Sequence, residues 1–445
     1  MMKTKLVLLL LAVFAAACAT TAPPPKSLPA PAPPRAANPT DYRKELEDAY
    51  AAILAREHAP VPAPKVDVEA AASIPIPEHK TIRGALAYFT TDLKPSIQES
   101  LLRSAKYKKL IDAALAEARL PKGLAYLPVI ESAYTPTLTS RAGAHGIWQF
   151  MPETAREYGL RVDWWVDERA DPERSTRAAA AYLRDLYRQF NDWPLTLAAY
   201  NAGPGRIKRA LDENKATTFW ELLDAGAVPK ETRGYVPTFF ATLLIATDPA
   251  TYGFRLGEPK DFDGKRVAVE GPLSLHHVAE VANVDEAVLR ELNPALRHGI
   301  VPPGRVEVRV PSKAAETVSA RAATMKNDDA SVAVCSFTLR EGDSLERIAA
   351  ALGVPPATLA DMNGGRAARE GDSIYLPVRA RDLGATLSQM SYAVRKGDTY
   401  FSIAKKFGLT VEELLDLNEL SQSHMLHPGE RLRVTPARAL TAGGM

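Results

Sequence analysis

The sequence predicts a multidomain fold, in which a mostly α-helical domain is followed by small α+β modules of the βααβ type. Apolar residues recur at helical spacing with little interruption between residues 82 and 252. Further along, one residue pattern is repeated, and each copy ends on a glycine and a short β-like segment. A chain of 445 residues is also too long for a single ordinary domain.

Composition narrows the classes of function. The net charge of +2 argues against a strongly electrostatic partner such as nucleic acid. Two cysteines, Cys18 and Cys335, are too few for a disulfide framework or a cysteine-based zinc site. The eight histidines are scattered, and no His-Glu-x-x-His motif occurs. We therefore expect neither a metal nor a cofactor.

Residues 1–18 predict export as a lipoprotein. Two lysines precede an apolar run from Leu6 to Ala17, which is too short to span a bilayer but typical of a secretory signal. The run ends at Cys18 and resembles a bacterial lipobox, with Ala15 in place of the usual leucine. Acyl chains on Cys18 would anchor the mature chain to a membrane. The alternative is an ordinary signal peptide with an incidental cysteine.

The residues after the cysteine predict a location and a tether. Ala19 stands there instead of aspartate, which resembles lipoproteins sorted to an outer membrane, so we expect a periplasmic protein anchored to that membrane. Residues 19–80 are rich in proline and alanine and predict a tether. Within it, Asp41 to Glu57 has the apolar spacing of a short helix. The mostly α domain follows over residues 81–258.

The repeat predicts three modules, over residues 262–311, 333–378 and 391–436. The sequence Arg340-Glu-Gly-Asp-Ser recurs in similar form as Arg395-Lys-Gly-Asp-Thr. The apolar residues, glycines and asparagines that follow keep the same spacing in both copies. The first copy is weaker and lacks the Gly-Asp start. Residues 312–332 and 379–390 are expected to be linkers.

The chemistry of the helical domain centres on Glu131, which follows the apolar pair Val129-Ile130. Apolar surroundings disfavour the charged form of a carboxyl and should raise its pKa, as a general acid requires near neutral pH. Downstream, Trp148 offers a flat face for a sugar ring, and Gln149 offers an amide. The alternative is a solvated surface glutamate and a core tryptophan.

The motifs resemble two known families. The repeats resemble LysM modules, which bind glycans containing N-acetylglucosamine, such as peptidoglycan; sugar binding by the first copy is in doubt. The helical domain resembles the lysozyme-like catalytic domain of lytic transglycosylases, specifically the membrane-bound lytic murein transglycosylase D family. Five stretches carry this resemblance in order: Leu127-Pro-Val-Ile-Glu-Ser, Ser140 to Pro152, Asp167-Glu-Arg-x-Asp-Pro, Ala198-Ala-Tyr-Asn-Ala-Gly and Glu231-Thr-Arg-x-Tyr-Val-Pro.

The resemblance implies a role for each matched residue. It makes Glu131 the catalytic acid and places five residues around the substrate cleft: Ser140, Gln149, Met151, Tyr200 and Asn201. Two positions depart from the family pattern, since His145 replaces a smaller or apolar residue and Gly234 replaces a commoner asparagine.

Other interpretations of these residues stay open. Tyr200 and Trp148 can equally serve the core, and Asn201 is a plausible turn residue. Asp167 is more typical of a loop held by Arg169 than of chemistry. Glu231 is either a helix-start carboxylate or a group that acts at a distance from the reaction.

The implied reaction cleaves the bond between N-acetylmuramic acid and N-acetylglucosamine in peptidoglycan, and the sugar's own 6-hydroxyl closes a 1,6-anhydro ring. Most glycosidases use two carboxylates, one on each side of the bond that is cleaved. The next acidic residue after Glu131 is Glu153, so the sequence shows no second carboxylate close to Glu131. One carboxyl suffices if it first gives and then retakes the proton. Two alternatives remain: a lysozyme-type hydrolase with a carboxylate brought in from elsewhere, and a non-catalytic peptidoglycan-binding protein.

Overall fold

The computed structural model describes most of the chain after the tether. The described residues are 46, 49–260, 262, 264–325, 334–339, 343–352, 354–365, 368–378, 391–407, 409–421 and 423–434. The expected signal segment, the expected lipidation site at Cys18 and residues 19–45 lie outside them, as does the start of the repeat at Arg340.

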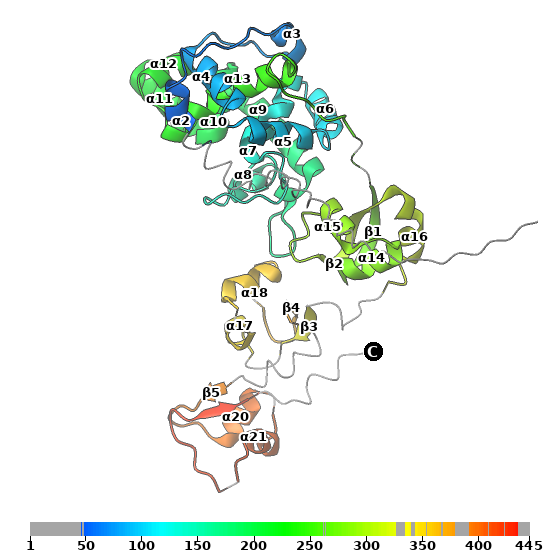
Figure 1. Ribbon diagram of the computed structural model, residues 1–445. Coiled ribbons are helices and arrows are strands. Elements are labelled where there is room, and N and C mark those ends of the chain that lie inside the picture. The colour runs from blue at the N-terminus through cyan, green and yellow to red at the C-terminus, as the bar shows by residue number, and fades with distance from the viewer. Residues whose placement is uncertain are drawn as a thin grey trace, which may run out of the picture. The chain divides into compact units, whose positions relative to one another are not determined.

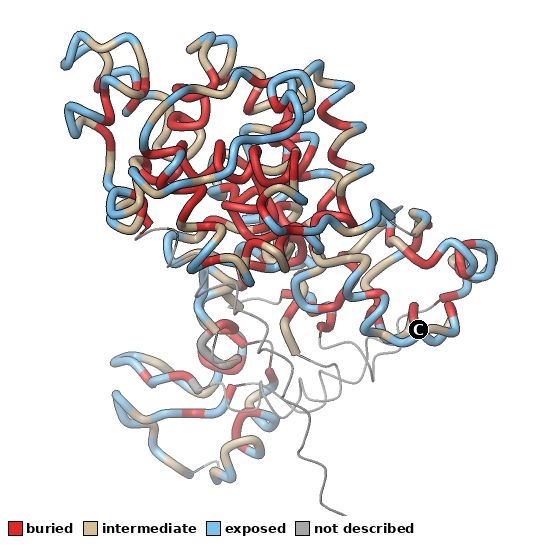
Figure 2. Tube along the Cα trace, turned by 45° about the horizontal axis from the view of Figure 1, so that its top comes forward, coloured by how far each residue is buried: buried red, intermediate tan, exposed pale blue. Residues whose placement is uncertain are grey.

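A single helical domain forms around two buried helices (Figure 1). Helix α10 (Trp193–Ala202) is apolar on nearly every face, and α13 (Lys230–Thr247) is buried from Gly234 to Ala246, as expected for helices inside a core. Figure 2 shows the buried residues gathered in the middle of this domain. The surrounding helices are α4 (Lys80–Thr90), α5 (Lys94–Ser104), α6 (Lys108–Glu117), α7 (Leu127–Ser132), α8 (Pro152–Glu157), α9 (Pro172–Phe190), α11 (Pro204–Asn214) and α12 (Phe219–Asp224). The prediction of a mostly α domain is confirmed.

Side-chain caps fix where several of these helices begin. The carboxylate of Asp171 accepts hydrogen bonds from two backbone amides at the start of α9, and Asp192 does the same for one amide of α10. Thr218 and Glu221 form a capping box at the start of α12. These polar residues therefore set the boundaries that the apolar periodicity leaves open.

Two short helices precede this domain in sequence but belong to its core. Helix α2 (Ala49–Leu54) buries Ala49 and Ile53, and α3 (Val68–Ala72) buries Val68 and Ala72, in the same apolar cluster as the helices of the large helical domain. The sequence places both inside a tether. The structure differs because α2 packs against α4 and α13, and α3 packs against α13 and the short helical turn Lys122–Tyr126, so both join the core through residues outside their own segment.

Each of the three repeats contains the expected strand, two helices and strand. Each strand pair is antiparallel. The elements are β1 (Lys265–Ser274), α14 (Leu275–Ala282), α15 (Glu286–Leu292) and β2 (Ile300–Val310) in the first module, β3 (Cys335–Thr338), α17 (Leu345–Leu352), α18 (Pro356–Met362) and β4 (Ser373–Leu376) in the second, and β5 (Ser391–Ala393), α20 (Tyr400–Lys406), α21 (Val411–Leu417) and β6 (Arg431–Arg433) in the third.

A repeated asparagine explains part of the sequence pattern. Asn363 donates from its side chain to the carbonyl oxygens of Leu359 and Tyr375 and accepts from the amide of Tyr375. Asn293 and Asn418 make the same three bonds in their modules. This asparagine joins the end of the second helix to the last strand, so its recurrence serves folding.

The first module extends beyond its last strand. Helix α16 (Ala315–Arg321), in the stretch expected to be a linker, buries Ala315 and Val318 in the core of that module. Within the described ranges, no helix combines the length and apolarity needed to cross a membrane.

Candidate active site

Glu131 lies at the end of a short buried helix. All six residues of α7 are buried, and Glu131 itself is only 5% exposed. The hydroxyl of Ser132 donates to the carbonyl oxygen of Ile147 (2.9 Å), which ties α7 to the loop that follows. Ala133 ends the helix in the left-handed conformation, and Arg103 donates to its carbonyl oxygen (2.7 Å). The loop at Ile147 and the side chain of Arg103 therefore both hold the backbone around the Glu131 carboxyl.

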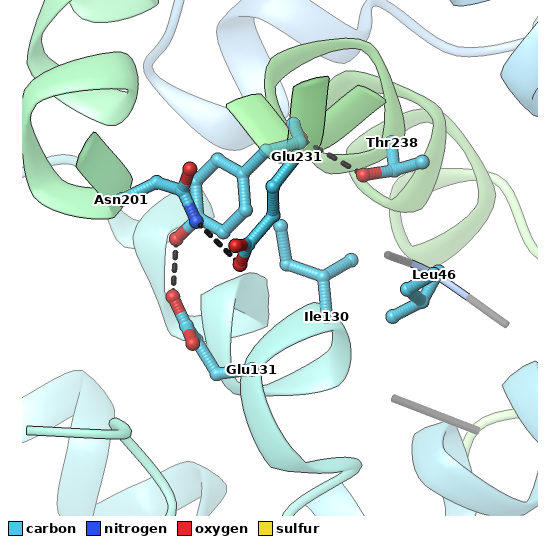
Figure 3. A pocket seen from close by; sticks show the side chains of 7 residues that line it. Leu46, Ile130, Glu131, Asn201, Glu231 and Thr238 are labelled. Atoms are coloured by element: carbon cyan, nitrogen blue, oxygen red, sulfur yellow. Dashed lines mark hydrogen bonds between the residues drawn. The ribbon is translucent and has the colours of Figure 1, made fainter. Parts of the chain in front are cut away.

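Tyr235 is the direct partner of the Glu131 carboxyl. Its phenol donates a hydrogen bond to Oε1 of Glu131, drawn as a dashed line in Figure 3, and both side chains are buried. Tyr235 is held in turn by α13, where Thr238 donates to its carbonyl oxygen (2.8 Å). A phenol O–H aimed at one carboxyl oxygen fixes the orientation of the carboxyl and stabilises its ionised form.

A second carboxylate reaches the same site. Glu231, at the start of α13, accepts a hydrogen bond from the side-chain amide of Asn201 (3.3 Å). The oxygen of that amide accepts from the hydroxyl of Thr232 (2.7 Å), so the amide has one defined orientation. Figure 3 shows Glu131, Asn201 and Glu231 around one cavity. Its place in the first turn of α13 agrees with the interpretation of Glu231 as a helix-start carboxylate, and it also lines the cavity beside Glu131.

A cleft of about 330 Å³ opens beside Glu131. That volume is within the range of small-molecule sites. The cleft brings together with Glu131 all five residues that the resemblance placed around the substrate: Ser140, Gln149, Met151, Tyr200 and Asn201. Met151 is 40% exposed and lines the cleft, so its apolar side chain is open to a ligand there.

Trp148 is a correction to the sequence prediction. Its ring is fully buried, and its indole N–H donates to the hydroxyl of Thr176 in α9 (2.9 Å). A ring with no exposed face cannot stack on a sugar, so Trp148 serves the core, which was the alternative interpretation.

The polar groups of the loop from Leu138 to Phe150 largely hold the loop itself. Ser140 accepts from the amide of Ala144 (3.0 Å) through its hydroxyl. The side-chain amide of Gln149 donates to the carbonyl oxygens of Leu138 (3.0 Å) and Gly146 (2.8 Å). These bonds give the cleft wall a fixed shape before any substrate binds.

A buried ion pair supports this loop from behind. Arg169 and Asp167 are joined by two hydrogen bonds (2.7 and 2.8 Å), and Arg169 also donates to the carbonyl oxygens of Gly143 and Phe150. Burial raises the pKa of Asp167, but the hydrogen bonds and charge of Arg169 outweigh it and hold that pKa below its usual value. The interpretation of Asp167 as a loop-fixing residue is confirmed.

Gly146 lets the loop approach the backbone of Arg169 closely. It has a positive φ of 86°, and a Cβ there would lie 1.9 Å from the carbonyl oxygen of Arg169. Gly146 therefore permits a close backbone approach that a residue with a side chain would block. Gly143 also needs glycine for its positive φ of 89°.

Tyr200 is a neutral donor at the cleft wall. Its hydroxyl donates to the carbonyl oxygen of Trp148 (2.8 Å). Burial, and then the charge of Glu131, raise the pKa of Tyr200 well above its usual value. It therefore stays protonated in the pH range in which a general acid works.

The arrangement suits proton transfer to a bound saccharide: one buried carboxyl, oriented by a phenol, lies beside a polar cleft. Among the described residues, no group of three or more His, Cys, Asp or Glu side chains is arranged to hold a metal ion. Sequence reasoning missed the roles of Tyr235 and Glu231 at the site, although both stand in the last matched motif.

Family models match three parts of the chain. Residues 109–223 match the Transglycosylase SLT domain. Residues 264–327 match the LysM-like domain of lytic transglycosylase MltD, and residues 337–375 and 392–435 match the LysM domain.

Individual relatives carry the comparison further. The chain is 33% identical over 377 residues to membrane-bound lytic murein transglycosylase D of Escherichia coli K12, covering 80% of this chain and 82% of that one. It is 36% identical over 117 residues to the soluble lytic murein transglycosylase of the same organism, covering 25% and 18%. A solved inactive mutant of the lytic transglycosylase Slt from Pseudomonas aeruginosa is 26% identical, covers 35% of this chain and 25% of that one, and has a TM-score of 0.29.

Proposed function

The chain belongs to the membrane-bound lytic murein transglycosylase D family, and from this premise we propose that it cleaves peptidoglycan with Glu131 as its one catalytic acid and base. The bond broken joins N-acetylmuramic acid to N-acetylglucosamine, and the product ends in 1,6-anhydro-N-acetylmuramic acid. The observation that carries the proposal is the buried Glu131 carboxyl at the wall of a saccharide-sized cleft, oriented by Tyr235.

In the first step, Glu131 protonates the oxygen of the scissile bond as that bond breaks. The hydrogen bond from Tyr235 stabilises the carboxylate that remains. In the second step, the 6-hydroxyl of the muramic acid residue attacks its own anomeric carbon and returns its proton to Glu131. The internal hydroxyl competes with water because an attached, oriented nucleophile has a high effective molarity.

The cleft residues hold the sugar for this chemistry. Tyr200 and Ser140 offer hydroxyls in the same cleft as the carboxyl, Asn201 offers an amide fixed by Glu231, and Met151 offers an apolar surface. Gln149 shapes the wall through its bonds to the loop backbone.

A hydrolase is the second candidate, because Glu231 supplies a carboxylate in the same cleft. In that reaction Glu231 would activate a water molecule. Against it, Glu231 already accepts a hydrogen bond from Asn201, as a positioning group would.

The second and third modules bind glycan strands and keep the enzyme on its insoluble substrate; both match the LysM family. The chain reaches that substrate from a lipid anchor on Cys18 in the outer membrane, with residues 19–40 as tether. The lipobox-like end of the apolar leader supports this part of the proposal.

The end groups of the products test the proposed function. Purified peptidoglycan is digested, and the fragments are analysed by mass spectrometry. Ends in 1,6-anhydro-N-acetylmuramic acid support the transglycosylase. Free reducing ends, each heavier by one water, would establish the hydrolase instead, and undigested glycan would leave only the binding function.

A further inference from the structure

Helix α2 packs against the helix that carries Tyr235. Ala49 and Ile53 of α2 are fully buried in the core of the catalytic domain. A Cβ placed on Gly234, the residue before Tyr235, would lie 3.5 Å from the backbone nitrogen of Tyr50. Helix α2 therefore lies so close to α13 that a side chain at Gly234, the residue before Tyr235, would touch it.

The contact of α2 with α4 is closer still. A Cβ on Gly84 would lie 2.1 Å from the carbonyl oxygen of Ile53, so only glycine allows the two helices to approach this far. Beyond the end of α2, Arg56 donates to both carboxylate oxygens of Asp92 (2.9 Å each). These contacts fix the position of helix α2 on the catalytic domain.

The same segment reaches the catalytic cavity. Leu46, which precedes α2, lines the small cavity beside Glu131 together with Ile130, Tyr235 and Thr238 (Figure 3). The cavity is small, with a volume of about 20 Å³, which is room for about one water molecule. Leu46 is thus an apolar wall of the space behind the reacting carboxyl.

We propose that Leu46 and helix α2 form a positioning element of the active site, although they lie upstream of the matched transglycosylase domain. The helix holds the backbone of Gly234 and Tyr235, and Leu46 limits the water that reaches the Glu131–Tyr235 pair. A displaced Tyr235 would aim the carboxyl wrongly, and small misplacements of catalytic groups are costly. The inference rests on the proposed function, since it assigns this element to the same reaction.

Two leucines of the same segment give a matched test. Leu46→Ala shortens the side chain that lines the cavity, whereas Leu54→Ala shortens one that is 40% exposed. The mature chain without its lipid is assayed on peptidoglycan by the rate of formation of anhydro ends. We expect Leu46→Ala to lower kcat about tenfold with little change in KM. Leu46→Met, which restores apolar volume, should recover most of the rate, and Leu54→Ala should match wild type.

Thermal unfolding separates positioning from stability. Leu46→Ala should remain fully folded at the assay temperature. Gly84→Ala, which forces α2 away from α4, should lower kcat in the same way if it folds. Wild-type kcat in Leu46→Ala, or equal losses in Leu46→Ala and Leu54→Ala, would overturn the inference while leaving the proposed function intact. A wild-type chain that yields no anhydro ends would instead overturn the proposed function.

Discussion

Tyr235 donates a hydrogen bond to the carboxyl of Glu131 across 104 residues of sequence. The two residues come from different helices, and each is fixed independently: α7 by bonds from Ser132 and Arg103, and α13 by its burial in the core. A rigid pair of this kind presents the acid in one orientation to whatever the cleft binds.

Tyr235→Phe should slow the reaction without unfolding the protein. The ring still fills its place, but the bond to the carboxyl is lost. Hydrogen bonds to charged groups are worth about 1.5–3 kcal/mol, which corresponds to roughly a 10- to 150-fold loss in rate. We expect the loss in kcat and little change in KM, measured on peptidoglycan by the formation of anhydro ends.

Tyr252→Phe is the matched control for Tyr235→Phe, because the buried hydroxyl of Tyr252 has no hydrogen-bond partner among the residues that the structure describes. It should retain the wild-type rate. A Tyr235→Phe variant as active as this control would contradict the positioning role of Tyr235.

The order of motifs along the chain made much of the fold predictable. The helical stripes, the repeat and the βααβ modules are local patterns, and the structure confirms them. The contact of Tyr235 with Glu131 is not local, so no spacing in the sequence reports it. Helix α2 was missed as part of the core for the same reason: its partners, Gly84 and Gly234, are distant in sequence, and proline-rich segments surround it.

The sequence motifs predicted most of the candidate site, and the burial of one residue, Trp148, corrected the prediction. Glu131 and five cleft residues come together as the resemblance implied. Trp148 does not, because a tryptophan beside a cleft motif gives the same sequence pattern whether its ring faces solvent or the core. Only the packing against α9 and the bond to Thr176 decide between the two.

Asp167→Asn should destabilise the protein and reduce its sensitivity to acid. The variant leaves the guanidinium of Arg169 buried without its charge partner, which typically costs about 3–5 kcal/mol. Since folding lowers the pKa of Asp167, its contribution is fully present above the unfolded value of about 3.9 and is lost as the pH falls toward the folded value.

Urea unfolding at pH 7 and pH 3 measures both effects. The free energy of unfolding should fall between the two pH values by less in Asp167→Asn than in wild type. Asp212→Asn, which changes an exposed aspartate on α11, is the control. Equal pH dependence in wild type and Asp167→Asn would show that the ion pair does not supply acid-sensitive stability.

Removing the two LysM modules should separate binding from cleavage. A chain that ends at residue 330 should bind insoluble peptidoglycan weakly yet still cleave short soluble glycans, because the cleft is intact. A chain that ends at residue 390 keeps one of the two modules and should bind at an intermediate level, since tandem sites raise the effective concentration. Sedimentation with peptidoglycan measures the binding. Equal binding by all three chains would make the modules spacers.

Cys18→Ala should release the protein from the membrane. If Cys18 carries lipid, the variant should move from the membrane fraction to the soluble periplasm, as followed by fractionation and immunoblotting. The wild-type chain treated with an inhibitor of lipoprotein processing is the comparison. A variant that stays in the membrane fraction with its leader cleaved would rule out the lipid anchor.

Glu131→Gln should abolish cleavage while leaving the fold and glycan binding unchanged. Glutamine keeps the shape and can accept the bond from Tyr235, but it cannot give and retake a proton. General acid catalysis is typically worth about 10²–10⁴ in rate, and here one residue serves both steps, so we expect near-complete inactivation.

Controls on other carboxylates make the Glu131 experiment decisive. Glu213→Gln changes an exposed carboxylate on α11 and should leave the rate unchanged. Glu231→Gln weakens the hold on Asn201 and should slow the reaction, yet it should retain measurable formation of anhydro ends, since Glu231 transfers no proton in the proposed mechanism. An active Glu131→Gln variant would mean that another residue is the acid. Complete loss of activity in Glu231→Gln, together with free reducing ends from wild type, would establish the two-carboxylate hydrolase.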